Sequence, residues 1–255
     1  MLDIELIKGT PTDLNKLLIS GSLDISPISS IEYGRHNESL VLFPDFTVSS
    51  DGEVKSILLL SRFPIEQLAG KKVALTNTSA TSQVLLKLIL RHGYRVEPDY
   101  IICPPDLDSM LLTADAALLI GDIALKHYVN AEDFCLYDLG AEWKKLTGKK
   151  MVYAVWAVNR PFAETRAETA GYVFNIFRTS MDYSVQHLSE IAEYAARWET
   201  FSSSFLIEYF RSLRFDFGKE YQEGLLHFYR LASEIGELKT VPDLQFINLR
   251  SGVNT

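Results

Sequence analysis

Residues 73–90, VALTNTSATSQVLLKLIL, contain the pattern that decides the fold of this chain. The apolar run Val73–Leu75 is typical of a buried strand, and the apolar spacing from Val84 onward is typical of one buried helix face. Between them lies a turn rich in hydroxyl groups. A strand that enters a helix through such a turn leaves the first helical N–H groups unpaired beyond the end of the strand, where open α/β sheets bind ligands.

The turn itself predicts a site for a small anion. It lacks the glycines of a dinucleotide-binding fingerprint and the Gly-Lys-Ser/Thr of a P-loop, so no nucleotide is indicated. Its hydroxyl and N–H donors suit a compact group such as a carboxylate. The alternative is that Thr78 or Ser79 only caps the helix, which is worth about 1 kcal/mol.

Strand and helix signals alternate on both sides of this stretch. From residue 71 to residue 150 they predict a βαβαβαβα run with parallel strands and right-handed crossovers. The hydroxyl turn recurs at Ser29-Ser30, and a related strand-to-helix turn is predicted at Gly121-Asp122. A weakly alternating strand is predicted at Asp3–Ile7. After Pro161 the pattern is helical as far as about Gly236.

Two lobes are predicted from the long apolar strands Ile57–Arg62 and Tyr153–Val158. Lobe 1 would comprise residues 1–70 and 159–255, including the C-terminal helices, and lobe 2 would comprise residues 71–158. The chain would cross between the lobes twice, and the crevice between them is the natural place for a small ligand. The fold class is therefore α/β, with parallel-rich sheets and a helical C-terminal block.

Composition restricts the partners of the protein. The 255 residues are 47% apolar, as in ordinary globular proteins, and the net charge of −8 argues against a nucleic-acid or acidic-membrane surface. No secretory signal or membrane-spanning run is visible. Cys103 and Cys135 stand alone and indicate reduced thiols in a cytoplasmic protein. The five histidines lack zinc-ligand spacing, so no metal is predicted.

A set of motifs in sequence order resembles one enzyme family. The segments are Ile25–Tyr33 (ISPISSIEY), Leu75–Ser82 (LTNTSATS), Asp115–Asp122 (DAALLIGD), Tyr137–Gly140 with Trp143, and Ala154–Ala157 (AVWA). Together they resemble chorismate dehydratase of the futalosine route to menaquinone. This resemblance covers nearly the whole chain and implies the two-lobed fold of type II periplasmic binding proteins, used here in the cytoplasm.

The resemblance implies a hydro-lyase that needs no metal or cofactor. Water would leave chorismate and the ring would become aromatic, giving 3-[(1-carboxyvinyl)oxy]benzoate. The substrate's own carboxylate is thought to remove the proton in this family, and the protein would position the ring through oriented N–H and O–H donors.

The same resemblance implies site residues in both lobes. In lobe 2, a carboxylate would be held by Thr78, Ser79, Ala80 and Thr81, with Ser79 the residue most directly tied to catalysis. Ser29 and Ser30 would face them from lobe 1. Gly121 would let the ligand approach the backbone, and Asp122 would either cap its helix, which is the favoured interpretation, or bind a ring hydroxyl.

One departure from the family leaves alternatives open. The family usually begins with a further strand and a Tyr-x-Asn loop whose asparagine contacts the ring, and this sequence starts at what resembles the second strand. A shortened record of the chain is the favoured explanation. The rival functions are a cytoplasmic small-anion binding or sensor protein without turnover, and the sister enzyme that makes a dihydroxynaphthoate.

The C-terminal helices carry many aromatic residues, among them Tyr194, Trp198, Phe201, Phe205, Tyr209 and Phe210. They predict an amphipathic packing face, with a homodimer surface as the alternative. Trp143 and Trp156 are expected in the core, and Trp156 is the better candidate of the two for contact with a ligand.

Overall fold

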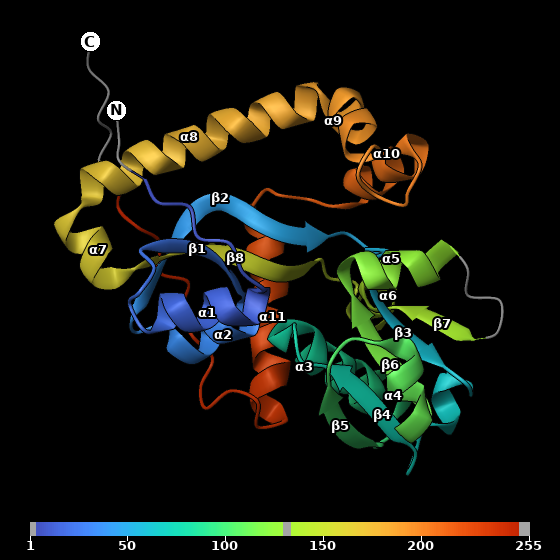
Figure 1. Ribbon diagram of the computed structural model, residues 1–255. Helices are drawn as coiled ribbons and strands as arrows, with labels where there is room; N and C mark the ends of the chain where they lie inside the picture. The colour runs from blue at the N-terminus through green and yellow to red at the C-terminus, as the bar shows by residue number, and fades with distance from the viewer. Residues whose placement is uncertain (1–3, 130–133, 250–255) are drawn as a thin grey trace.

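Two β-sheets with helices against their faces form the fold of the computed structural model, which describes residues 4–129 and 134–249 (Figure 1). The first sheet has the order β1-β8-β2, with strands β1 (Ile25–Ser29), β2 (Leu40–Ser50) and β8 (Met151–Asn159). The second has the order β5-β4-β6-β3-β7, with strands β3 (Ile57–Ser61), β4 (Lys72–Thr76), β5 (Asp99–Cys103), β6 (Ala116–Ile120) and β7 (Cys135–Asp138). We call the first sheet and its helices lobe 1, and the second sheet with its helices lobe 2.

The helices follow the predicted order. Those in the first part of the chain are α1 (Pro11–Ile19), α2 (Ser30–His36), the 3₁₀ turn η1 (Ile65–Gln67), α3 (Ala80–Leu88), the π-helical turn η2 (Ile89–Tyr94), α4 (Leu107–Thr113), α5 (Gly121–Val129) and α6 (Leu139–Thr147). The C-terminal block contains α7 (Arg160–Thr165), α8 (Ala167–Gln186), α9 (Leu188–Ala195), α10 (Ser203–Ser212) and α11 (Lys219–Glu234). None of the helices within the described residues combines the length and apolar character that a membrane span needs.

The apolar strands of lobe 2 are buried on both faces. Along β3, Leu58 and Leu60 point into one hydrophobic cluster, which includes α4, whereas Leu59 points into the cluster shared with α3 and α6. Because successive side chains of a strand alternate between faces, a strand covered on both sides must be apolar at every position. This explains the unbroken run ILLL that the sequence shows at residues 57–60.

Strand direction agrees with the prediction in only part of the molecule. β4 pairs in parallel with both β5 and β6, as expected from the βαβ pattern. β3 lies antiparallel between β6 and β7, and the first sheet is antiparallel throughout its described strands. The parallel-rich prediction is therefore wrong for lobe 1, because β8 returns from lobe 2 and inserts between β1 and β2.

Sheet membership also differs from the predicted lobe limits. The limits at residues 70/71 and 158/159 assign β3 to lobe 1 and β8 to lobe 2, but each strand pairs in the other sheet. The chain crosses to lobe 2 through residues 51–56, before β3, and reaches lobe 1 again with β8. Apolar patterning predicts a buried strand but carries no information about which sheet it joins, and this explains the error.

The strand predicted at Asp3–Ile7 is wrong for the part that the structure describes; Asp3 lies outside the described residues. Residues 4–10 have no regular secondary structure, and the Ile4 and Leu6 side chains are exposed. β1 is the edge strand of its sheet, and this segment does not pair with it. A segment with alternating apolar and polar residues forms a β-strand only beside another strand, because its backbone N–H and C=O groups have no partners within the segment.

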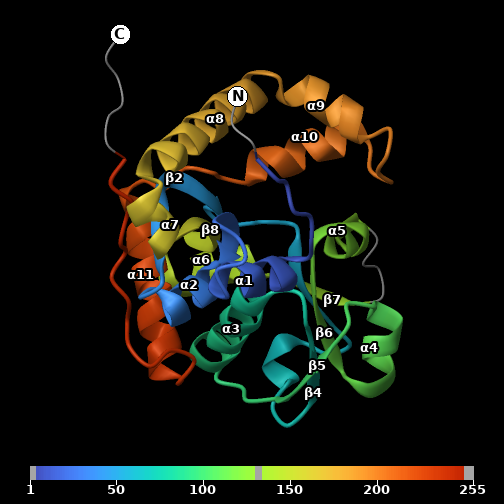
Figure 2. The same cartoon turned by 60° about the vertical axis from the view of Figure 1, so that its left-hand side comes forward.

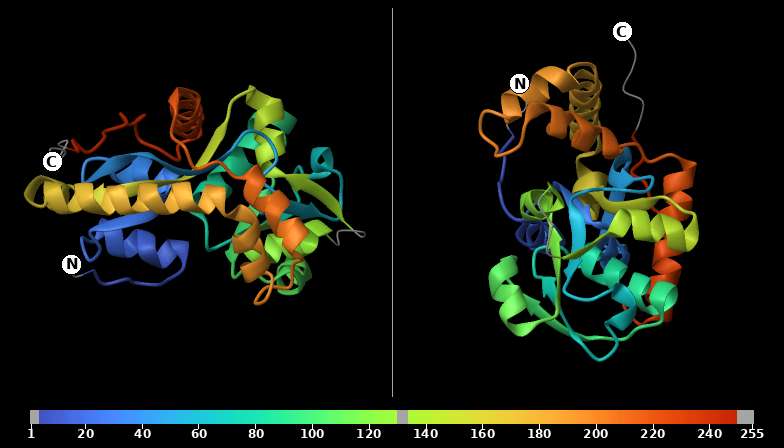
Figure 3. Two further views of the ribbon diagram at one scale, coloured as in Figure 1. Left: turned by 90° about the horizontal axis from the view of Figure 1, so that it is seen from above. Right: turned by 90° about the vertical axis from the view of Figure 1, so that its right-hand side faces the viewer.

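The C-terminal helices connect the two lobes. α8 extends across lobe 1, and α9 and α10 reach over α5 of lobe 2 (Figures 1 and 3). Leu125 of α5 shares a hydrophobic cluster with Phe201 and Leu206, against which further aromatic residues of α10 pack. The predicted packing face is confirmed for Phe201, Phe205, Tyr209 and Phe210, whereas Tyr194 and Trp198 of the same set are exposed.

Both tryptophans that were weighed as ligand contacts belong to hydrophobic clusters. Trp143 is fully buried, and its ring N–H donates to the Lys150 carbonyl at 3.2 Å. Trp156 packs against Phe46, with 6.2 Å between the ring centroids. The expectation of a core position is confirmed for Trp143, whereas Trp156 is partly buried and packs against its cluster.

Candidate functional site

The turn between β1 and α2 is held from α1. Asn15, which is buried, donates its side-chain N–H to the Ser29 hydroxyl at 3.1 Å and accepts the Ser29 backbone N–H at 3.2 Å. Ser29 precedes the helix without capping it. The Ser29 hydroxyl oxygen therefore has a fixed position. Within the described residues, no hydrogen bond uses the hydrogen of this hydroxyl.

Ser30 has a different environment from its neighbour. Its side chain is fully buried, and its hydroxyl donates to the Val152 carbonyl of β8 at 2.8 Å. The Tyr229 hydroxyl in turn donates to the Ser30 carbonyl at 2.7 Å. This hydroxyl stabilises the packing of α2 on β8, so the group expected to face the ligand is already donated within lobe 1.

The turn between β4 and α3 contains the predicted cap. Ser79 precedes α3 in an extended conformation, and its hydroxyl accepts the Ser82 N–H at 3.3 Å. The Thr78 and Thr76 hydroxyls are 2.7 Å apart and bond to each other. Thr78, Ser79 and Ala80 are all partly accessible to solvent. Capping by Ser79 is confirmed, and its role toward a substrate stays a prediction.

The two hydroxyl turns meet at the junction of the lobes. The Ile31 N–H, in the first turn of α2, donates to the hydroxyl of Thr81 in α3 at 3.2 Å, and both groups are buried. On the same side, the Thr12 hydroxyl of α1 donates to the Asn77 carbonyl at 3.0 Å. α1, α2 and α3 therefore converge where the lobes touch (Figure 2). Ser29 and Ser79, predicted from separate parts of the sequence, flank this contact.

A third turn, between β6 and α5, lies at the same edge of the lobe 2 sheet. β6 is parallel to β4 and pairs with it directly, so the ends of both strands emerge side by side, about 5 Å apart. Gly121 has a φ of +64°, a conformation that favours glycine, and its N–H donates to the Ser56 carbonyl at 2.8 Å. The geometry explains why glycine is present at this turn, and the approach of a ligand to its backbone stays a prediction.

The capping interpretation of Asp122 is wrong. α5 already begins at Gly121, so Asp122 occupies the first turn of the helix and not the position before it. Its side chain is exposed, and a negative charge there is favourable because the N-terminal end of a helix is positive.

Sequence reasoning missed two residues of this third turn. Ser56 is buried directly before β3, and Tyr209 of α10 lies near it. Burial raises the pKa of Tyr209, the hydrogen bond to Ser56 lowers it, and the nearby Asp122 carboxylate raises it. Tyr209 was predicted only as a packing aromatic, and no local signal distinguished it from Phe205 or Phe210. Asn15 was missed for a similar reason, since it lies in an ordinary amphipathic helix.

The first turn and the start of α3 present neutral hydrogen-bond donors. The Ser29 and Thr81 hydroxyls each accept one bond and keep a hydrogen that none of the described bonds uses. Helix N-termini and fixed hydroxyls of this kind stabilise negative charge without an opposing positive side chain. Asp122 is the one carboxylate among the predicted site residues, and it lies at their edge. The arrangement suits a ligand with carboxylate groups and a further hydroxyl.

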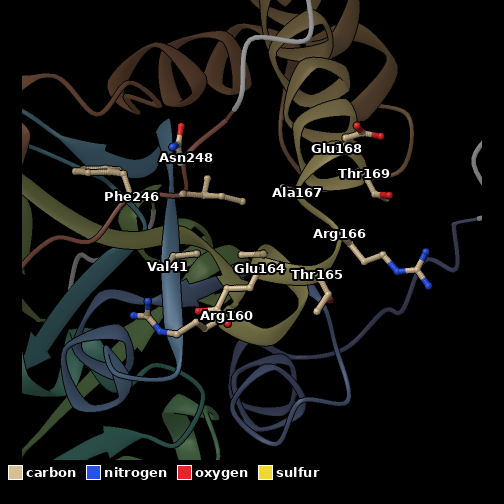
Figure 4. A pocket seen from close by; sticks show the side chains of 12 residues that line it. Val41, Arg160, Glu164, Thr165, Arg166, Ala167, Glu168, Thr169, Phe246 and Asn248 are labelled. Atoms are coloured by element: carbon tan, nitrogen blue, oxygen red, sulfur yellow. The ribbon is translucent and has the colours of Figure 1, made fainter.

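Two cavities lie elsewhere, near the ends of α8. The one at its start has a volume of about 630 Å³ and is lined by residues of β2, α7, α8 and the C-terminal segment (Figure 4). The other, of about 680 Å³, lies near its end and includes Phe46, Met181 and Phe210. No residue of the three turns lines either of them. Arg160, in the first cavity, already donates to the carbonyls of Glu38 and Leu40, so its position there is structural.

Known proteins resemble this chain in sequence and in fold. The chain is 34% identical over 206 residues to a curated chorismate dehydratase of Thermus thermophilus, a match that covers 75% of this chain and 73% of that protein. Solved structures at low identity share the fold. A Candida albicans protein with the generic periplasmic binding protein fold matches with a TM-score of 0.66 at 13% identity, covering 95% of this chain and 86% of that one. The aliphatic sulphonate binding protein SsuA of Escherichia coli matches with a TM-score of 0.57 at 14% identity, covering 92% and 78%.

These neighbours confirm the expected fold class of two lobes with a periplasmic-binding-protein-like architecture. The model of the menaquinone biosynthesis family matches residues 1–234, which is most of the chain. Together with the identity to the curated dehydratase, this match shows that the chain belongs to the menaquinone biosynthesis family.

Proposed function

We propose that this protein is a chorismate dehydratase, a hydro-lyase that eliminates water from chorismate. The observation that carries the proposal is the meeting of two hydroxyl turns across the lobe junction, through the bond from the Ile31 N–H to Thr81. It occurs in a chain one third identical to a curated enzyme of that name. Neither the binding-protein alternative nor the sister synthase has comparable support.

The reaction needs little chemistry from the protein. The C–H bond at the ring carbon bearing the enolpyruvyl ether breaks, a ring double bond forms, and the C–O bond of the neighbouring hydroxyl breaks. The proton and the hydroxide leave together as water, and the ring becomes aromatic in 3-[(1-carboxyvinyl)oxy]benzoate. Since aromatisation drives the reaction, the site has to hold the ring and favour departure of the hydroxyl.

The three turns divide these tasks in the proposal. Thr78, Ser79 and the first N–H groups of α3 bind one substrate carboxylate, and the Ser29 hydroxyl binds from lobe 1. The Gly121 turn, with Asp122 and Tyr209 beside it, faces the leaving hydroxyl. The substrate's own carboxylate accepts the proton, as the family resemblance implies, and passes it to the departing hydroxide to form water, so no protein base is assigned.

Incubation of the purified protein with chorismate tests the proposal. The expected result is loss of the diene absorbance, appearance of a benzoate spectrum, and a product lighter than chorismate by one water on mass spectrometry. Unchanged chorismate would overturn the proposal. Unchanged chorismate together with saturable binding would identify an anion-binding protein instead.

A pair of variants tests the location of the site. Ser29→Ala removes a hydroxyl placed beside the lobe junction, and a lost donor to a carboxylate should lower kcat/KM on the order of 10-fold. Ser61→Ala is the control, because Ser61 is equally buried at the end of β3 but donates only to the Phe63 carbonyl. Equal effects of the two substitutions would place the substrate elsewhere.

The cellular setting belongs to the same proposal. A dehydratase of chorismate in this family fits the futalosine route to menaquinone and a cytoplasmic location. Self-association into a homodimer is supported by the exposed aromatic side chains Tyr194 and Trp198 of the C-terminal block. Sedimentation of the wild type and of a Trp198→Ser variant tests that part separately.

A further inference from the structure

The first crossing between the lobes, residues 51–56, is held by a carboxylate from lobe 2. Asp138 ends β7 and precedes α6, and it accepts the Ala141 N–H at 3.0 Å as an ordinary helix cap. The same carboxylate also accepts the Val54 N–H at 3.1 Å and the Lys55 N–H at 2.6 Å. Capping requires only the first of these bonds, so the other two serve the crossing.

Packing around the crossing leaves no spare room. A Cβ atom added at Gly140 would lie 2.3 Å from the Gly52 carbonyl oxygen and 2.6 Å from the Tyr153 hydroxyl. Ser50 links these groups, because its hydroxyl donates to the Gly52 carbonyl at 2.7 Å and lies 2.8 Å from the Tyr153 hydroxyl. The start of α6, the crossing and β8 therefore form one fixed unit.

The backbone at the end of the crossing adopts an unusual conformation. Lys55 has a φ of +63°, a left-handed geometry that side chains other than glycine rarely adopt and that needs support from neighbouring groups. The bond from its N–H to Asp138 supplies such support. Burial raises the pKa of Asp138, and the N–H groups of Ala141, Lys55 and Val54 lower it.

The crossing leads directly into the candidate site. Ser56 follows Lys55, and its carbonyl accepts the Gly121 N–H at 2.8 Å. The placement of the Gly121 turn therefore depends on where the crossing sets Ser56.

We propose that Asp138 is a positioning residue for the site: it fixes Val54 and Lys55, and through Ser56 it places the Gly121 turn. This inference rests on the proposed function for its catalytic consequence, but its structural part stands without it. Asp138 touches no substrate. Its action on the reaction passes through backbone hydrogen bonds, at the point where the chain leaves one lobe for the other.

Hydrogen exchange of backbone amides, followed by mass spectrometry or NMR, tests the structural part. In Asp138→Ala the Val54, Lys55 and Gly121 amides should exchange about 10-fold or more faster, since they lose a buried acceptor or its support. Asp106→Ala is the matched control, because Asp106 caps α4 through the Ser109 N–H at 2.9 Å and has no contact with the crossing. It should leave those amides unchanged.

Asp138→Asn separates the helix cap from the bonds to the crossing. It also keeps the test available should the alanine variant fail to fold. Its amide oxygen, in the place of Oδ1, still accepts the Ala141 and Val54 N–H groups. An NH₂ group replaces Oδ2, which accepts the Lys55 N–H, so the Lys55 amide should exchange faster while the cap is kept. With chorismate, kcat/KM should fall about 10-fold in Asp138→Asn and stay unchanged in Asp106→Ala.

Three experimental outcomes would contradict the role of Asp138, its link to the site, or the proposed function. Unchanged exchange at Val54 and Lys55 in both Asp138 variants would reduce Asp138 to a cap and overturn the inference. Faster exchange at the crossing with unchanged exchange at Gly121 would overturn its link to the site. Absence of turnover in the wild type would reject the proposed function, whereas the exchange result would still decide whether Asp138 positions the Gly121 turn.

Discussion

The turn between β1 and α2 and the turn between β4 and α3 share a sequence pattern but use their hydroxyls differently. In the second turn Ser79 caps its own helix. In the first, α2 has no side-chain cap, and the Ser29 and Ser30 hydroxyls bond to Asn15 and to β8. The Ile31 N–H of α2 is instead bound by Thr81 of the other lobe. The same hydroxyl-rich pattern thus makes different hydrogen bonds in the two turns, because the elements packed around each turn determine the partners.

Removal of the Asn15 side-chain amide, which bonds to Ser29 in the first turn, should have the largest effect on stability. Asn15→Ala leaves the buried Ser29 N–H without its acceptor and opens a small cavity, so the free energy of unfolding in urea should fall by about 3 kcal/mol. Thr12→Val on the same helix breaks a more exposed bond to Asn77 and should cost about 0.5 kcal/mol. Similar losses of stability in both variants would show that the bonds from α1 to the two turns contribute equally.

The contact between the turns is tested by Thr81→Val. This change keeps the shape of the side chain but removes the acceptor of the buried Ile31 N–H, so stability should fall by about 1–2 kcal/mol and turnover of chorismate should slow. Thr81→Ser restores a hydroxyl and should recover most of both. A valine variant as stable and as active as the wild type would mean that Ile31 does not depend on this bond.

Ser79→Ala should separate capping from substrate binding in the second turn. Loss of the cap should lower stability by about 1 kcal/mol without unfolding the protein, and chorismate binding or turnover should weaken. Ser202→Ala removes an equivalent cap from α10, where Ser202 accepts the Phe205 N–H at 3.2 Å, and should cost a similar stability with native kinetics. Native kinetics in both variants would leave Ser79 as a cap alone.

The smallest expected effect concerns pH, because neither hydroxyl turn contains an ionisable side chain. His227 of α11 lies beside Trp143, and burial lowers its pKa, with Arg230 and Lys149 lowering it further. Below pH about 6.5, His227 is therefore protonated in the unfolded chain but still neutral in the folded protein. Stability falls as the pH is lowered below this value, because the unfolded state binds more protons.

His227→Gln should reduce that fall in Tm between pH 7 and pH 5, whereas Thr81→Val should retain it. A slope that changes in the Thr81 variant and not in the His227 variant would trace the acid response to the lobe junction.

Local pattern predicted much of the secondary structure and part of the site. The strand predicted at Val73–Leu75 and the helix face predicted from Val84 onward lie in β4 and α3, and the Ser79 cap was anticipated. The helix departs from the prediction only at its end, where Ile89–Tyr94 forms a π-helical turn. These features depend on groups within about four residues of each other, so they can be inferred without a fold.

Partners distant in sequence were beyond prediction. Ser29 meets Asn15 14 positions away, Ile31 meets Thr81 50 positions away, and Ser30 meets Val152 122 positions away. Tyr209 looked like a packing aromatic, and Asp138 stood out only as part of a family motif, because their further contacts lie on other elements. The choice of sheet for β3 and β8 has the same origin, since apolar runs fit any buried position.

The sequence by itself determined where strands give way to helices through donor-rich turns, because periodicity and capping are set by near neighbours along the chain. The tertiary structure decided which hydroxyls remain available, which lobe each long strand joins, and how the crossing at residues 51–56 places the third turn. Those outcomes depend on which distant groups satisfy each buried N–H and O–H, and that is settled only when the elements pack together.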